Sequence, residues 1–307
     1  MSAAPPLEPG APSVRPCAAR VWLHAARPRT LGASAIPVLV GTAVAAREGA
    51  ARLDVLVECL LAATLLQIAA NLVNDASDFL AGIDGATRRG PERVTQAGLR
   101  SPRSVQRAAV LCLGFASLIG VHLILIGGAL ILAIGLLAGA CAVGYSAGPL
   151  RLASRGLGEL AAFVFFGAIA VVGTDYLHTG QLSGLALVVS LPIGALIANV
   201  MLANNLRDLE SDRACAKRTL VVRLGAAGGR KLFSLTMAFA FLAPVGLALG
   251  FGLGWGPLLS WLSLPVAVSL RGQLARARSG EELDRVLVGS ARLHALFGVL
   301  LALGLLR

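Results

Sequence analysis

The chain has little charge, few aromatic side chains and almost no lysine. Only 14% of its 307 residues are charged and 5% are aromatic, and lysine accounts for two of the 27 basic residues. A soluble domain of ordinary composition carries about 25% charged residues, so a soluble globular protein is excluded. The five cysteines are odd in number and lack ligand spacing, which argues against a disulfide framework or a zinc site.

Long apolar runs are what the chain has in abundance. Runs of around twenty apolar residues recur along it, and each can cross roughly 30 Å of hydrocarbon as a helix. No alternating strand pattern typical of a membrane β-barrel is present. The sequence therefore predicts an all-α, polytopic membrane protein, with about nine transmembrane helices in a bundle around a central cavity. The spans are expected near residues 29–47, 54–73, 106–126, 128–146, 157–175, 183–204, 231–252, 255–271 and 288–306.

The first residues are rich in proline and have no apolar core, so they do not resemble a signal peptide. Residues 1–26 are expected to form a disordered cytoplasmic tail, and residues 27–307 a single transmembrane domain.

The basic residues predict the orientation. In the nine-span arrangement 24 of the 27 lie on one side, and Arg47, Arg52 and Arg307 lie on the other. Basic residues favour the cytoplasmic side, so we expect a plasma-membrane (inner-membrane) protein with a cytoplasmic N-terminus and an external C-terminus. The net charge of +11 is then a topology signal, and it requires no nucleic-acid partner.

Two polar stretches interrupt this apolar chain. They are "NLVNDASDFLAGID" (71–84) and "NNLRDLESDRACAKRT" (204–219), and each follows an apolar run. Helical spacing places on one face of the first stretch Asn71, Asn74, Asp75 and Asp78. It places on one face of the second stretch Asn204, Asp208 and Asp212. Their matching positions after even-numbered spans indicate a coarse internal repeat whose two halves share one site.

Carboxylates near lipid are costly and usually face a polar cavity with a function. Mg²⁺ prefers oxygen ligands and is often held by one or two carboxylates together with substrate phosphates. Six basic residues lie near the carboxylates in sequence and can neutralise a diphosphate: Arg88, Arg89, Arg93, Arg207, Lys217 and Arg218. The stretches therefore predict a site for Mg²⁺ and a diphosphate. Helix capping, headgroup-level ion pairs and a cation-coupled transporter are the alternatives.

Several blocks resemble one family, the UbiA superfamily of membrane prenyltransferases. Its two Asp-rich motifs are similar to the polar stretches above. The branch that acts on 1,4-dihydroxy-2-naphthoate is resembled most, through "RPRTLGASAIPVLVGTA", "RRGPERVTQAGLRSP", "YSAGPLRLASRGLGEL" and "GTDYLHTG". Two departures are Ala76, where the branch commonly has an aromatic residue, and Asp175 before Tyr176, where it commonly has two tyrosines.

The resemblance implies transfer of a polyprenyl group from polyprenyl diphosphate to 1,4-dihydroxy-2-naphthoate, with loss of CO₂, to give the demethylmenaquinol of menaquinone biosynthesis. Implied as catalytic Mg²⁺ ligands are Asp75, Asp78, Asp208 and Asp212. Implied as substrate-binding residues are Asn71, Asn74, Asp84, Arg88, Arg93, Asn204, Lys217, Arg218 and Tyr145. Tyr145 and Tyr176 are candidates to steady the prenyl cation, with packing as the alternative role.

Other readings stay open at this point. Within the superfamily the acceptor could instead be 4-hydroxybenzoate, homogentisate, haem or chlorophyllide. Outside it, "DGATRRG" begins like the signature of CDP-alcohol phosphotransferases but lacks the rest of that motif.

Overall fold

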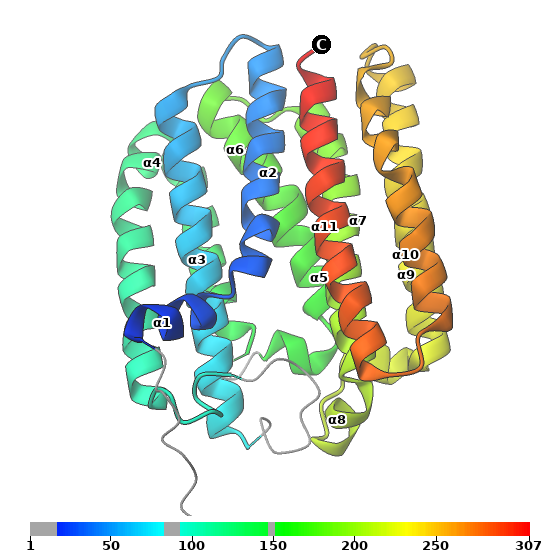
Figure 1. Cartoon of the computed structure of the whole chain (residues 1–307). Helices are drawn as coiled ribbons and strands as arrows, with labels where there is room; N and C mark the ends of the chain where they lie inside the picture. The colour runs from blue at the N-terminus through cyan, green and yellow to red at the C-terminus, as the bar shows by residue number, and fades with distance from the viewer. Residues whose placement is uncertain (1–16, 83–92, 147–150) are drawn as a thin grey trace, which may run out of the picture.

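The computed structural model describes residues 17–82, 93–146 and 151–307, and every regular element in these ranges is a helix. Seven helical segments in them are long and apolar enough to cross a membrane. These are α2 (Pro28–Arg47), α3 (Leu53–Leu80), α4 (Pro102–Gly144), the consecutive α5 (Gly158–Ala162), η2 (Phe163–Ile169) and α6 (Ala170–Thr179), α7 (Gly184–Arg207), α9 (Leu220–Gly250) and α11 (Gly280–Leu305). The shorter elements are α1 (Ala18–Ala26), η1 (Leu152–Arg155), α8 (Leu209–Ala214), η3 (Gly256–Ser263) and α10 (Leu264–Arg276). The long helices form an upright bundle, with α3 and α4 at one edge and α9 and α10 at the other (Figure 1).

The predicted spans near 106–126 and 128–146 are the two halves of α4. Between them Gly128 has φ 63° and ψ −150°, a conformation that glycine alone adopts readily. Before this break, His122 Nδ1 lies 2.7 Å from Glu58 Oε2 in the first half of α3. After it, Ser146 Oγ accepts a hydrogen bond of 2.6 Å from Asn74, near the other end of α3. The chain therefore turns back at Gly128.

A further pass is made by η3 and α10 together, where a span was predicted near 255–271. At one end, Gly256 lies so close to Gly304, near the end of α11, that a Cβ added to it would overlap the carbonyl oxygen of Gly304. At the other end, Arg230 Nη2, near the start of α9, donates to the carbonyl of Ala277 at 2.8 Å. With the two passes of α4, the described residues cross the bundle nine times, in agreement with the prediction.

Small residues allow the helices to pack closely, as the abundance of glycine and alanine predicts. A Cβ on Gly167 in η2 would lie 2.7 Å from the Cα of Gly194 in α7. On the other side of α7, the main apolar core includes the fully buried Phe233 of α9 and Phe297 of α11. These contacts hold α7 in place. The second polar stretch begins at the C-terminal end of α7, so the same contacts position that stretch.

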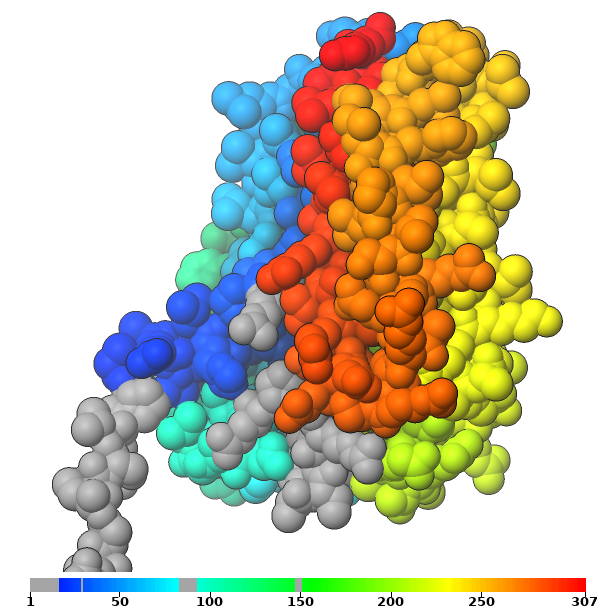
Figure 2. All heavy atoms as spheres, turned by 45° about the vertical axis from the view of Figure 1, so that its right-hand side comes forward, coloured from blue at the N-terminus to red at the C-terminus, as the bar shows by residue number. Residues whose placement is uncertain are grey.

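The prediction that residues 1–26 form a disordered tail is wrong for its last part, because Ala18–Ala26 form α1. Val21 and Ala25, spaced four apart, are 4% and 2% exposed and pack with Leu72 of α3 in one apolar cluster. The guanidinium of Arg100 lies 5.5 Å from the ring centroid of Trp22. Figure 2 shows α1 projecting sideways from the bundle towards its lower end. Its amphipathic face was too short to be recognised in sequence.

The basic residues predicted for the outer side lie at one end of the bundle. Arg47 Nη1 contacts the carbonyl of Leu305 at 3.4 Å, and the backbone N–H of Arg52 donates to His178 Nδ1 at 3.2 Å. The C-terminus is at this end as well, and α8, in the second polar stretch, lies at the opposite end (Figure 1).

Candidate active site

A cavity of about 1460 Å³ runs inside the bundle and includes both polar stretches in its walls. Along α3 its lining extends from Asp78 to Cys59, a distance of about 28 Å at the helical rise of 1.5 Å per residue. The walls near Asp78 carry charges and amides, whereas those near Cys59 include Leu123, Ile131 and Leu177. The cavity can therefore hold a charged head group at one end and a long apolar chain beyond it.

In the first polar stretch the amides tie α3 to its neighbours. Asn71 Nδ2 donates to the carbonyl of Ala26 at 3.0 Å and to Thr30 Oγ1 at 3.1 Å. Asn74 makes the bond to Ser146 described above. The predicted face is formed, since both amides and the two carboxylates of this face line the cavity. The amides thus position the helix end from which the carboxylates project.

Asp75 is 2% exposed and holds the chain that follows the first motif. Its carboxylate accepts hydrogen bonds from the backbone N–H of Val94 at 3.3 Å and of Thr95 at 3.4 Å, and also from the hydroxyl of Thr95. Asp75 therefore combines a place in the cavity wall with a structural role for residues 94–95.

Asp78 and Asp212 bring the two polar stretches together. Lys217 Nζ lies 3.8 Å from Asp78 Oδ2 and 3.7 Å from Asp212 Oδ1, and Arg93 Nη1 lies 2.9 Å from Asp78 Oδ2. Burial raises the pKa of Asp212 to about 6, although the Lys217 ammonium acts in the opposite direction. Two carboxylates from distant segments thus converge on one cation in a mostly buried space.

The second stretch is organised by Arg207, whose side chain is 3% exposed. Its Nε donates to Asp208 Oδ1 at 2.8 Å, and its Nη2 donates to Asn204 Oδ1 at 2.9 Å. Its Nη1 donates to Asp284 Oδ1 at 2.8 Å. Sequence reasoning missed Asp284, because the last span was predicted to begin at residue 288 whereas α11 begins at Gly280. One arginine therefore holds the second motif against α11.

A second contact that sequence reasoning missed joins Glu159 to Asn205. The Glu159 side chain, 4% exposed, accepts a hydrogen bond of 2.8 Å from Asn205 Nδ2. Asn205 lines the cavity, as does Tyr145, whose hydroxyl lies 3.9 Å from Met201 Sδ. Tyr176 is placed differently, because its hydroxyl donates to the carbonyl of Gly127 at 3.3 Å, at the turn within α4. Tyr176 therefore lies far from the carboxylates of the two polar stretches, and the prediction that it steadies the prenyl cation is wrong.

The remaining predicted site residues lie either outside the cavity lining or outside the described residues. Arg218 is exposed and outside the cavity lining, and its backbone N–H donates to the carbonyl of Ser154 at 3.0 Å. Glu210, in the second polar stretch, is exposed, with Arg213 Nη1 at 3.6 Å from its carboxylate. Asp84 and Arg88 lie outside the described residues.

The donor set fits a hard divalent cation in combination with a phosphate ligand. Within the described ranges no three His, Cys, Asp or Glu side chains form a ready-made metal cluster. Mg²⁺ does not need one, because it keeps waters and commonly takes only one or two carboxylates plus substrate oxygens. Asp78 and Asp212, which already share a cation, are the pair best placed for this role.

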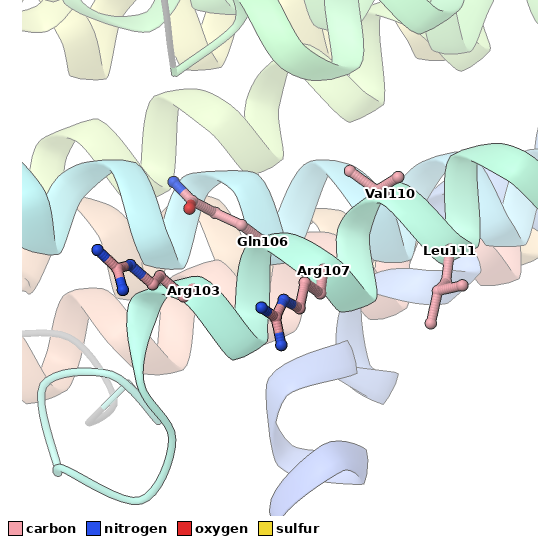
Figure 3. Close-up of a pocket in the computed structure, with 5 residues that line it drawn as sticks. All are labelled: Arg103, Gln106, Arg107, Val110 and Leu111. Carbon is pink, nitrogen blue, oxygen red and sulfur yellow. The ribbon is translucent and has the colours of Figure 1, made fainter.

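A second hollow, of about 510 Å³, has a different character. Its lining comes from the first turns of α4 alone: Arg103, Gln106, Arg107, Val110 and Leu111 (Figure 3). These side chains are exposed and include no carboxylate. Basic groups next to apolar ones are typical of a helix that meets the membrane surface. Because the second hollow has no carboxylate in its lining, we place the reaction site in the large cavity.

Several known proteins are similar to this chain. The chain is 37% identical over 266 residues to the 1,4-dihydroxy-2-naphthoate octaprenyltransferase of Mycobacterium tuberculosis, which covers 87% of this chain and 90% of that protein. It is 36% identical over 220 residues to the Escherichia coli protein of the same name, covering 69% and 71% of the two chains.

Solved structures share the fold. A UbiA homolog from Aeropyrum pernix K1 matches with a TM-score of 0.72 at 16% identity, over 89% of this chain and 97% of that one. A UbiA homolog from Archaeoglobus fulgidus, bound to DMAPP and Mg²⁺, matches with a TM-score of 0.63 at 14% identity, over 92% and 99%. The model of the UbiA prenyltransferase family matches residues 34–300. The chain, a helical membrane bundle with two convergent acidic motifs, therefore belongs to the UbiA prenyltransferase family.

Proposed function

We propose that this prenyltransferase moves a polyprenyl group from polyprenyl diphosphate to 1,4-dihydroxy-2-naphthoate with loss of CO₂. The observation that carries the proposal is the shape and charge of the cavity, which is lined along α3 over about 28 Å and has convergent carboxylates and cations at one end and apolar walls beyond them. The acceptor is supported by the relatives from M. tuberculosis and E. coli, which are named for the same naphthoate.

The carboxylates would hold Mg²⁺ at the polar end, with Asp78 and Asp212 as central ligands and Asp75 and Asp208 beside them. When bound, Mg²⁺ supplies positive charge that stabilises the departing diphosphate. Arg93 and Lys217, which already contact Asp78, neutralise the remaining diphosphate oxygens. Asn74 and Asn204 keep their helix ends in place for this contact.

In the reaction the allylic C–O bond breaks and the diphosphate leaves with the electron pair. A ring carbon of the acceptor then attacks the allylic carbon, forming the new C–C bond. The carboxylate on that ring carbon leaves as CO₂, and the electrons of its bond restore the aromatic ring, so no external oxidant is needed. The apolar walls exclude water from the allylic cation, and the Tyr145 ring is available to stabilise it.

The test is an assay of the purified protein with Mg²⁺, geranylgeranyl diphosphate and carboxyl-labelled 1,4-dihydroxy-2-naphthoate. We expect a prenylated product together with labelled CO₂. A cavity that accommodates a bicyclic ring should favour it over 4-hydroxybenzoate and homogentisate by about 10²-fold or more in kcat/KM, because a smaller ring leaves volume and polar groups unmatched. Equal use of the monocyclic acceptors would contradict the naphthoate assignment.

The side of the membrane is part of the proposal. The excess of basic residues at the motif end of the bundle supports a cytoplasmic active site in the plasma membrane.

A further inference from the structure

α11 forms one wall of the cavity and carries a buried polar group well above the carboxylates. Its lining residues run from Asp284, in contact with Arg207, to Ala295, and they include His294. His294 is 1% exposed, and its Nε2 has no hydrogen-bond partner among the described residues. Buried polar atoms are nearly always paired, so an unpaired one requires an explanation.

A second buried histidine, His178, provides a comparison for His294. His178 is 7% exposed and lies outside the cavity lining. Its Nε2 pairs with Thr42 Oγ1 at 3.0 Å, and its Nδ1 accepts from the backbone N–H of Arg52 at 3.2 Å. Both ring nitrogens are therefore satisfied by the protein, whereas His294 is a residue of the cavity lining whose Nε2 has no partner in the described part of the chain.

The wall around His294 is mostly apolar. The neighbouring lining residues on α11 are Val288, Ala291, Arg292 and Ala295, of which Arg292 is exposed. One turn further along α11, a Cβ added to Gly298 would overlap Ile36 Cγ2 of α2, so the helix packs closely against its neighbour there. A polar ligand atom that enters this part of the cavity thus has few polar groups to bind, and such groups orient ligands in apolar pockets.

The depth of His294 suits the acceptor rather than the diphosphate. His294 is ten residues above Asp284 on α11, or about 15 Å along the helix axis. Helical side chains lean towards the N-terminus of their helix, and the N-terminus of α11 is at the acidic end. The imidazole therefore lies between the acidic end and the apolar floor near Cys59, the zone in which the allylic carbon and the acceptor ring must meet.

We propose that His294 binds the aromatic acceptor through a hydrogen bond between Nε2 and a ring hydroxyl. The inference rests on the proposed naphthoate prenylation. In the proposed pose the ring carbon that bears the carboxylate lies over the allylic carbon near the diphosphate, and the 4-hydroxyl, which is not adjacent to that carbon, extends along the cavity towards His294. A neutral imidazole can donate or accept such a bond, and a hydroxyl is its natural partner.

The experiment measures equilibrium binding of two acceptors in the presence of Mg²⁺ and inorganic pyrophosphate. One is 1,4-dihydroxy-2-naphthoate, and the other is 1-hydroxy-2-naphthoate, which lacks the 4-hydroxyl. We expect the wild-type protein to bind the dihydroxy compound about tenfold more tightly, the usual worth of one hydrogen bond. His294→Leu should reduce that ratio to near one, and His294→Gln, which keeps a hydrogen-bonding group, should retain part of it.

His178→Gln is the matched control and should leave the ratio unchanged, because His178 does not line the cavity. Pyrophosphate binding by each variant reports that the fold and the polar end are intact, and the Gln variant decides the matter if the Leu variant fails this check. An unchanged ratio in the variants, or a wild-type ratio near one, would overturn the role of His294 alone. If the wild-type protein binds pyrophosphate but neither naphthoate, the naphthoate acceptor is wrong and the inference falls with it.

Discussion

At the scale of single residues, the polar end of the cavity is a set of buried charges that satisfy one another. Lys217 is shared by Asp78 and Asp212, and Arg207 by Asp208 and Asp284. Removing one partner from such a pair leaves an uncompensated charge, which costs more than the pair itself contributes. The arrangement keeps carboxylates from three helices and a loop at one place, ready for a cation and a diphosphate.

The first prediction concerns Asp78. Asp78→Asn keeps the shape of the side chain but removes the negative charge that faces both Arg93 and Lys217. We expect turnover to fall by about 10²-fold or more at saturating Mg²⁺, the size of effect seen when one stabilising group is removed from an active site. Product formation from geranylgeranyl diphosphate is the measurement. Glu210→Gln is the control, because Glu210 is exposed and outside the cavity lining, and near-normal turnover by Asp78→Asn would refute its role.

The second prediction concerns Arg207. Arg207→Met removes the guanidinium that binds Asn204, Asp208 and Asp284 and leaves two carboxylates without their partner. Asp208 and Asp284 are 20% and 35% exposed, so we expect a loss of about 1.5–3 kcal/mol in the free energy of unfolding, the usual worth of hydrogen bonds to charged groups. It should be seen as a lower midpoint in thermal unfolding of the detergent-solubilised protein. Arg213→Met, which removes an exposed pair with Glu210, should cost at most about 1 kcal/mol. Equal midpoints for the two variants would contradict the structural role of Arg207.

At the scale of helices, single glycines decide where apolar segments turn or approach one another. α4 is 43 residues long and could be read as one helix, but the conformation of Gly128 divides it into two passes. This turn places the second half of α4 beside the cavity and brings Tyr145, just after its end, into the wall. The shape of the site thus depends on a backbone feature far from the carboxylates.

The third prediction concerns this turn. Gly128→Ala forces a residue with a Cβ into φ 63° and ψ −150°, which costs about 1–3 kcal/mol. Gly135→Ala is a matched control in the same helix, since it has no positive φ and no atom within 4 Å of an added Cβ. We expect the Gly128 variant to unfold at a lower temperature and the Gly135 variant to match or slightly exceed the wild type. Similar unfolding temperatures for both variants would argue against the turn.

At the scale of the whole molecule, the two polar stretches, about 130 residues apart in sequence, meet at one end of the bundle. The opposite end holds the C-terminus and only a few basic residues. This polarity separates a charged reaction site from an apolar interior that can take a lipid-like chain. It also predicts a definite orientation in the membrane, because the motif end carries the excess of arginine.

The fourth prediction tests that orientation. In a background without cysteine, Ala214→Cys, at the end of α8, should react with a membrane-impermeant thiol reagent only from the cytoplasmic side. Ala51→Cys, between α2 and α3, should react only from outside, since both positions are exposed and lie at opposite ends of the bundle. Labelling of both cysteines from the same side would refute the topology.

Sequence by itself determined the class, the spans and the first acidic face. Apolar length and the helical period are local properties, so nine passes and the grouping of Asn71, Asn74, Asp75 and Asp78 followed from the order of residues alone. The turn at Gly128 was also marked, by the boundary between two apolar runs. Local pattern did not reveal α1, because its apolar face rests on only two fully buried residues.

Only the tertiary structure decided which charges meet and which polar groups face the cavity. Arg207 and Asp284 are 77 positions apart, and Glu159 and Asn205 are 46 apart. His294 and His178 are not distinguished by the sequence. Among residues 17–82, 93–146 and 151–307, however, His294 Nε2 has no partner and His178 is bonded through both ring nitrogens outside the cavity lining. Such partnerships depend on the register and tilt of helices packed through many small contacts. No single residue encodes them, because each contact exists only when the rest of the bundle is in place.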